Sequence, residues 1–235
     1  MSLGPRGRLV LFFHGGHSAA QPAPTQDPFL ATLSAPTPTP HIPSNYESGA
    51  NFIIKDGFTN NLNHNWYNHE YWTELAVGDG KLSFDSSDQD SYATAISTIT
   101  GPFDQPVYIQ ADLSTDASTA ESYGVLFDDH YPTNEFFVFQ INPESKQYTL
   151  HHHIGRQWYL RMSGVTDLIK SYPAANTIGI YMNKGYLEFY INHGMIDVYQ
   201  DSGSDFQSGQ TGFYANNSGF HVVVTNFAIN RTGAP

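Results

Sequence analysis

The stretch that decides the fold is residues 122–192, which read SYGVLFDDHYPTNEFFVFQINPESKQYTLHHHIGRQWYLRMSGVTDLIKSYPAANTIGIYMNKGYLEFYIN. Short runs rich in aromatic and β-branched residues follow one another here, and turn residues such as Asn142-Pro143 and Gly155-Arg156 separate them. Each run predicts a β-strand. Because short turns join antiparallel neighbours, the stretch predicts one meander, with alternate residues facing the core and the solvent.

Similar strand patterns lie on both sides of this meander. They cover residues 75–84, 92–98 and 106–114 before it, and 196–199, 210–215 and 220–229 after it. Nothing between residues 46 and 235 shows a sustained 3.6-residue apolar period, so no helix is predicted. Many short strands without a helix predict an all-β domain, either a two-sheet antiparallel β-sandwich of the jelly-roll kind or a closed barrel.

The first 45 residues differ in kind from the rest, and we predict a tail over 1–45 followed by one domain over 46–235. A five-residue apolar run, 9–13, follows two arginines and precedes small residues at 18–20. This pattern is that of a secretory signal remnant, although the run is shorter than the usual ~7–15 residues. Alternatively, the run is a short strand that docks on a sheet edge of its own or a neighbouring subunit.

Residues 21–45 carry seven prolines among Ala and Thr. Proline fixes an extended backbone and removes an amide donor, so this segment predicts an extended spacer; a disordered chain end is the alternative. Extended spacers of this kind hold a domain away from a cell surface. We therefore expect an extracellular or cell-surface protein.

The charge balance excludes several partners. Lys and Arg number 10 against 22 Asp and Glu, a net charge of −12, which argues against phosphate backbones and anionic membrane surfaces. We predict neither nucleic-acid binding nor membrane insertion. The chain has no cysteine, so it has no disulfide, thiolate metal site or cysteine nucleophile.

Acidic residues concentrate between Asp79 and Glu135, where the sequence has eleven carboxylates and one basic residue, Lys81. Solvated loops are the default interpretation, and the alternative is a Ca²⁺ site with oxygen ligands from separate loops, since no helix-loop-helix calcium motif occurs. The best oxygen cluster for such a site combines residues near the end of one strand with an acid from a neighbouring loop: Asp128, Asp129 and Asn134 with Asp112 or Asp116.

The period of two also predicts a water-facing surface rich in polar and aromatic groups. Its members are Gln140, His151, His153, Tyr181, Glu188 and Tyr190. Aromatic rings can stack on sugar rings while amide, imidazole and carboxylate groups bind hydroxyls, so this face suits a glycan. The alternative is an exposed sheet that binds nothing. A metal held by His151, His153 and Glu188 is a further alternative, and His152 is expected in the core or at its boundary.

The amide-rich segment 60–72 is also rich in tryptophan and tyrosine. Trp66, Tyr67, Tyr71 and Trp72 there form either a rim that grips a ligand or a plug at the end of the sandwich. Trp158 follows a hairpin turn, and we expect it to be structural.

Seven motifs in order resemble the concanavalin A-like lectin and glucanase superfamily, with laminin G-like jelly-roll domains as the nearest branch. They lie at residues 77–82, 122–129, 136–141, 147–158, 176–180, 187–192 and 209–215. The resemblance covers roughly residues 52–231. It implies a curved two-sheet sandwich whose concave face binds glycans in many members and whose rim loops hold calcium in some.

The resemblance does not supply an active site. Glucanases of this superfamily carry two glutamates and an aspartate at alternate positions of one strand, and no Glu-x-Asp-x-x-Glu or Glu-x-Asp-x-Glu occurs here. Glu188 alone cannot serve as both acid and nucleophile. We therefore predict a non-catalytic, lectin-like carbohydrate-binding or adhesion module whose partner is a glycan or surface polysaccharide. The alternatives are an assembly subunit that self-associates through its tail, and a glycoside hydrolase with an atypical acid set.

Overall fold

The computed structural model describes residues 52–60, 66–67, 73–86, 92–101, 106–115, 121–201, 203, 206, 208–216 and 221–232. All of them belong to one compact unit, Thr39–Pro235. The predicted tail and its apolar run lie outside the described residues, so the boundary at residue 46 stays a prediction. Within the described part of the chain, no helix is long and apolar enough to cross a membrane.

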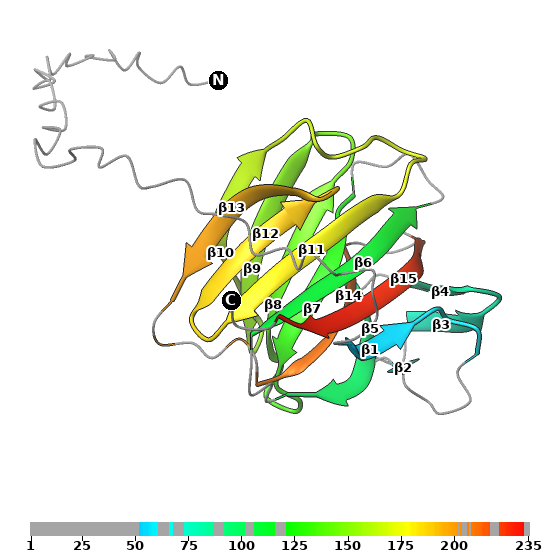
Figure 1. The fold of residues 1–235 in the computed structure, drawn as a ribbon, viewed down its shortest axis with the longest axis horizontal. Coiled ribbons are helices and arrows are strands. Elements are labelled where there is room, and N and C mark those ends of the chain that lie inside the picture. The colour runs from blue at the N-terminus through cyan, green and yellow to red at the C-terminus, as the bar shows by residue number, and fades with distance from the viewer. Residues whose placement is uncertain are drawn as a thin grey trace, which may run out of the picture. The chain divides into compact units, whose positions relative to one another are not determined.

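The described residues form two antiparallel sheets and no helix, which confirms the predicted β-sandwich (Figure 1). The eight-stranded sheet has its strands in this order, with β1 (Phe52–Asp56) also paired to β15: β13 (Gly194–Gln200), β12 (Tyr186–Ile191), β11 (Asn176–Asn183), β6 (Val107–Thr115), β15 (Val222–Arg231), β4 (Lys81–Ser86) and β3 (Thr73–Gly78). The seven-stranded sheet follows this order: β10 (Gln157–Val165), β9 (Gln147–Ile154), β8 (Glu135–Asn142), β7 (Tyr123–Asp129), β14 (Gln210–Asn216), β5 (Tyr92–Thr100) and β2 (Trp66–Tyr67).

The main hydrophobic core lies between the sheets and follows the predicted alternation. Ile178 and Ile180 of β11 and Leu187 and Phe189 of β12 are buried in it. The ring of Phe189 stacks on Phe139 of the other sheet, with 4.4 Å between centroids. Full burial of one such side chain stabilises the fold by about 1.5–3 kcal/mol.

Trp66 belongs to this core, which confirms its structural interpretation. Its ring stacks on Phe213 with 5.1 Å between centroids, and its indole Nε1 donates to Asp56 Oδ2 at 2.7 Å. Tyr67, the next residue, faces the other way and donates its hydroxyl to Gln210 Oε1 at 2.6 Å. Tyr71 and Trp72 lie outside the described residues.

The single meander predicted for residues 122–192 is wrong at one point. β7 to β10 form a meander in the seven-stranded sheet, but the chain then crosses and continues with β11 to β13 in the eight-stranded sheet. The crossing segment, residues 166–175, is anchored rather than loose: Ile169 is buried in the core, and Asn176 Nδ2 donates to the Lys170 carbonyl at 3.0 Å. Ten residues exceed the two to five of an ordinary hairpin loop.

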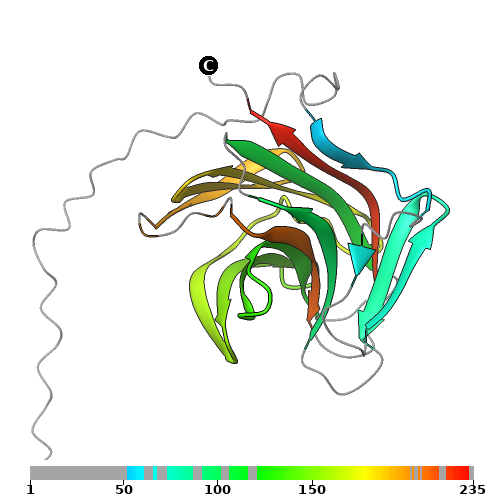
Figure 2. The ribbon, with the colours of Figure 1, turned by 90° about the horizontal axis from the view of Figure 1, so that it is seen from below.

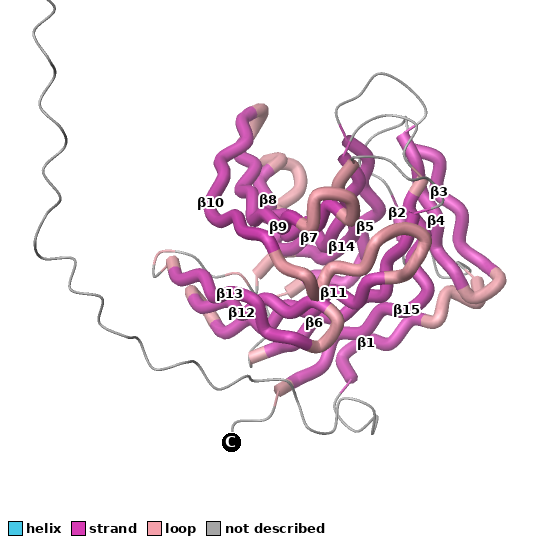
Figure 3. The backbone as a smooth tube through the Cα atoms, turned by 90° about the horizontal axis from the view of Figure 1, so that it is seen from above, coloured by secondary structure: helices cyan, strands magenta, loops and turns pink. Residues whose placement is uncertain are grey.

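The seven-stranded sheet is strongly curled, with its hollow side facing away from the other sheet (Figures 2 and 3). Trp158 on β10 and Tyr214 on β14 are four strand positions apart, about 19 Å in a flat sheet, yet their ring centroids lie 5.6 Å apart. Gly124 on β7 and Gly212 on β14 allow this curl, because a Cβ would lie 2.0 Å from the Phe139 carbonyl oxygen at Gly124 and 2.4 Å from the Ala95 carbonyl oxygen at Gly212.

Candidate functional site

Five rings meet on the concave face of the seven-stranded sheet, and we call them the aromatic cluster. They are Tyr92, Phe136, His153, Trp158 and Tyr214, from five different strands. The Trp158 centroid lies 4.5 Å from that of His153 and 5.6 Å from those of Phe136, Tyr92 and Tyr214. The curl of the sheet therefore brings residues 92, 158 and 214 together although they are far apart in the chain.

Trp158 gives this cluster an accessible surface, since it is 37 % exposed while His153 is 3 % exposed. The His153 ring stacks on Phe136 at 4.6 Å, and its Nδ1 lies 3.1 Å from the carbonyl oxygen of Asn134, to which it donates. Burial raises the pKa of Tyr214, so its hydroxyl stays protonated at neutral pH. The cluster is thus an aromatic surface with one partly exposed tryptophan.

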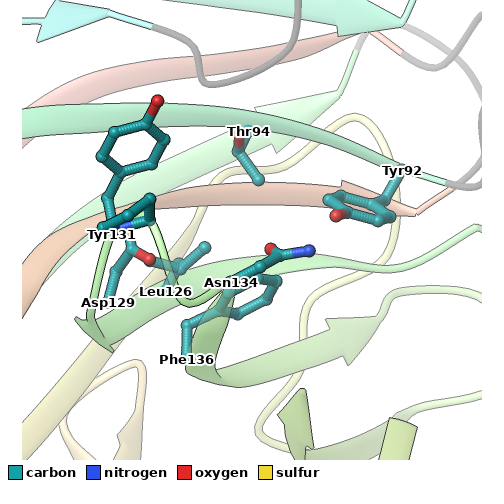
Figure 4. Close-up of a pocket in the computed structure, with 8 residues that line it drawn as sticks. Tyr92, Thr94, Leu126, Asp129, Tyr131, Asn134 and Phe136 are labelled. Carbon is teal, nitrogen blue, oxygen red and sulfur yellow. The ribbon is translucent and has the colours of Figure 1, made fainter. Parts of the chain in front are cut away.

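A cavity of about 190 Å³ opens beside the cluster (Figure 4). Rings of the cluster share its wall with polar side chains from β5, β7 and the turn after β7. The wall consists of Tyr92, Thr94, Leu126, Asp129, Tyr131, Pro132, Asn134 and Phe136. Tyr131 is 69 % exposed. The cavity is smaller than the roughly 300–1,000 Å³ of sites that enclose a whole ligand, so it suits part of a ligand lying in an open groove.

Three of the six predicted glycan-binding residues lie on this concave face: Gln140, His151 and His153. Gln140 Nε2 donates to Thr149 Oγ1 at 3.0 Å, while Gln140 Oε1 and His151 Nδ1 are buried atoms without a hydrogen-bond partner. Burial lowers the pKa of His151, so its ring is neutral at neutral pH. Both atoms are enclosed by the protein, so they are not surface groups that a ligand hydroxyl contacts directly.

The other three predicted residues lie elsewhere, so the prediction of one shared face is wrong. Tyr181, Glu188 and Tyr190 are on β11 and β12 of the eight-stranded sheet, because the chain changes sheets after β10. They are not water-facing either. Glu188 is fully buried and accepts hydrogen bonds from the hydroxyls of Tyr186, at 2.9 Å, and Tyr190. The proposed metal set of His151, His153 and Glu188 is excluded by the same separation.

The predicted calcium ligands do not converge either. Asp112 lies on β6 of the eight-stranded sheet and accepts from Thr177 Oγ1 at 2.6 Å, whereas Asp128 and Asp129 end β7 of the other sheet. Asn134 Nδ2 donates to the Gly155 carbonyl at 2.9 Å. Among the described residues no group of three or more His, Asp or Glu can hold a metal ion, and Asp116 lies outside them.

Asp128 instead belongs to a small polar cluster with His130 and Ser208. Its Oδ1 lies 2.9 Å from His130 Nε2, 3.0 Å from Ser208 Oγ and 3.1 Å from the amide nitrogen of Gly209. Ser208 Oγ lies 3.3 Å from the same His130 Nε2. A proton relay needs the carboxylate and the serine on opposite ring nitrogens, so this cluster holds the chain at 208–209 against β7 and does not activate a nucleophile.

Comparison with known proteins places the fold. No protein-family model and no curated protein matches the sequence. Among solved structures, carbohydrate-binding module CBM66 from Bacillus subtilis aligns with a TM-score of 0.58 and 11 % identity, over 71 % of this chain and 95 % of that one. A Bacillus subtilis protein of unknown function with a galectin-like fold gives 0.60 and 15 %, over 77 % and 96 %. Bacillus licheniformis β-glucanase gives 0.59 and 6 %, over 76 % and 97 %.

The chain has the concanavalin A-like jelly-roll fold. This confirms the fold that the resemblance implied, while membership of the superfamily and of its laminin G-like branch stays a prediction. In this concanavalin A-like sandwich, sequence reasoning missed most of the aromatic cluster. Tyr92, Phe136 and Tyr214 could have been assigned to the outer face, since they alternate with core residues such as Phe137 and Phe213. Trp158, predicted to be structural, lies on the same face and is partly exposed.

Proposed function

We propose that this protein binds carbohydrate on the concave face of its seven-stranded sheet. The observation that carries the proposal is the aromatic cluster, in which a partly exposed Trp158 lies beside a cavity lined by aromatic and polar side chains on a curled sheet. Sugar rings present apolar C–H faces that stack on aromatic rings, and their hydroxyls take hydrogen bonds from the side. Thr94, Asp129 and Asn134 line the adjacent cavity and supply polar groups there.

We infer that the role is binding rather than hydrolysis. Carboxylate catalysis of glycoside hydrolysis requires two carboxyl groups flanking the bond, about 5–5.5 Å or about 6.5–9.5 Å apart. Among the described residues that line the cavity, Asp129 is the one carboxylate. Glu188, the acid considered for an atypical hydrolase, is buried on the other sheet.

The test is a glycan array followed by titration calorimetry of the best ligand, each with Ca²⁺ and with a chelator. Trp158→Ala is expected to weaken binding by roughly thirtyfold, about 2 kcal/mol, as for other central aromatic contacts. Tyr172→Ala is the matched control, because Tyr172 is 42 % exposed and belongs neither to the aromatic cluster nor to the wall of its cavity. Uniformly flat arrays, or equal affinity for Trp158→Ala and the wild type, would refute the proposal.

We also propose that the domain begins near residue 46 and is displayed outside the cell, with the proline-rich segment as its spacer. Deleting residues 1–45 tests the assembly alternative at the same time. The truncated protein is expected to remain folded, to keep the same number of subunits per particle and to keep its ligand. A fall in the number of subunits would instead identify the tail as a docking element.

A further inference from the structure

A second and larger cavity lies on the opposite side of the sandwich, on the outer face of the eight-stranded sheet. It measures about 440 Å³, within the roughly 300–1,000 Å³ typical of ligand sites. Its principal lining residues come from β1, β6, β15 and the turn between β12 and β13: Phe52, Lys55, Gln110, Asp112, His193 and Asn226. None of them belongs to the concave face.

Asp112 lies at the centre of this surface with its carboxylate already oriented. Thr177 Oγ1 donates to its Oδ1 at 2.6 Å, and Asn226 Nδ2 lies 3.4 Å from its Oδ2. A carboxylate has about four acceptor positions on its two oxygens, so two neighbour contacts leave it able to accept a pair of ligand hydroxyls. Two hydroxyls on adjacent carbons match that geometry.

The remaining groups surround this carboxylate with further hydrogen-bonding capacity. Gln110 is 5 % exposed and projects from the same face of β6 as Asp112, because Ile109 and Ala111 face the core. His193 sits in a turn whose preceding residue, Asn192, is fixed by its Nδ2, which donates to the Leu168 carbonyl at 2.7 Å. The polar groups therefore project from paired strands and from an anchored turn.

The charges of the cavity indicate a neutral ligand. The lining holds one carboxylate, Asp112, and one ammonium, Lys55, whose formal charges cancel; the ammonium lies 5.2 Å from the Phe52 ring centroid. We propose that this cavity is a second binding site for a neutral polyhydroxylated ligand, a sugar unit held through a vicinal diol on Asp112. The site is independent of the concave face, so the protein has two sugar sites on opposite sheets.

The test uses the full-length chain and asks separately how many sugar molecules bind and where they bind. The probes are a panel of neutral monosaccharides, glucose, galactose, mannose and fructose, followed by ¹H–¹⁵N NMR of the asparagine and glutamine side-chain amides. We expect the Gln110 and Asn226 signals to shift on titration, and Asp112→Asn to weaken this binding about tenfold. Asp167→Asn, an equal charge change at an exposed turn residue, is the matched control and leaves the shifts unchanged.

Phe52→Ala serves as a second variant at the rim of the cavity, in case Asp112→Asn unfolds. If binding is weakened in Asp112→Asn and Phe52→Ala but kept in Trp158→Ala, the outer site is supported, whatever the outcome at the concave face. If the only binding observed disappears with Trp158→Ala and is indifferent to Asp112→Asn, the outer site is overturned and the concave site stands. Absence of amide shifts with all four sugars overturns it as well.

Discussion

Replacing Gly124 by alanine tests whether the curl of the seven-stranded sheet depends on glycine. A Cβ at this position would lie 2.0 Å from the carbonyl oxygen of Phe139 and 2.6 Å from the Cα of Gln140. Both are backbone atoms of the paired strand β8, so relief requires the two strands to separate. Overpacking by a methyl group costs about 1–3 kcal/mol, and because no flexible side chain can yield here, we expect the upper end, about 3 kcal/mol.

The assay is urea unfolding followed by far-UV circular dichroism, with thermal unfolding alongside. For a domain of this size, about 3 kcal/mol corresponds to a fall in Tm of about 6–12 °C. Gly57→Ala is the control, because nothing lies within 4 Å of a Cβ there, and its effect should stay within about 0.5 kcal/mol. If Gly124→Ala proves as stable as Gly57→Ala, the close approach of β7 and β8 is not what shapes the groove.

Two further substitutions test contacts inside the fold. Asp56→Ala removes the acceptor of both the Trp66 indole, at 2.7 Å, and the Phe58 amide, at 2.7 Å. We expect it to lower the free energy of unfolding by about 2 kcal/mol, whereas the control Asp167→Ala should leave that free energy unchanged. Equal urea midpoints for the two variants would contradict this. Burial lowers the pKa of His152 below 6.5, and the hydrogen bond to Glu135 opposes this shift only in part. Just below pH 6.5 the unfolded chain therefore binds more protons than the folded chain, so the folded state loses stability as the pH falls. His152→Gln should therefore give a flatter pH profile of the urea midpoint below pH 6.5, and an unchanged slope would show that His152 does not contribute.

The sequence predicted which residues of a strand face inward, because that depends only on the alternation of neighbouring side chains. Ile178, Ile180, Leu187 and Phe189 are buried as expected, and His152 lies at the core boundary, stacked on Phe137 at 3.9 Å. The all-β class followed from the same local signal, which left a two-sheet sandwich and a closed barrel as alternatives. The expectation drawn from the acidic composition, that neither nucleic acid nor a membrane is a partner, stays a prediction.

Only the tertiary structure decided which sheet each strand joined. Alternation separates inside from outside but does not distinguish one outer face from the other, so Gln140 and Glu188 looked like neighbours and lie on opposite sheets. The aromatic cluster was likewise hidden, because Trp158 meets Tyr92 and Tyr214 only through the curl of a sheet whose strands are far apart in the chain. Such contacts are fixed by long-range pairing and by backbone approach at glycines, neither of which a local pattern of residues encodes.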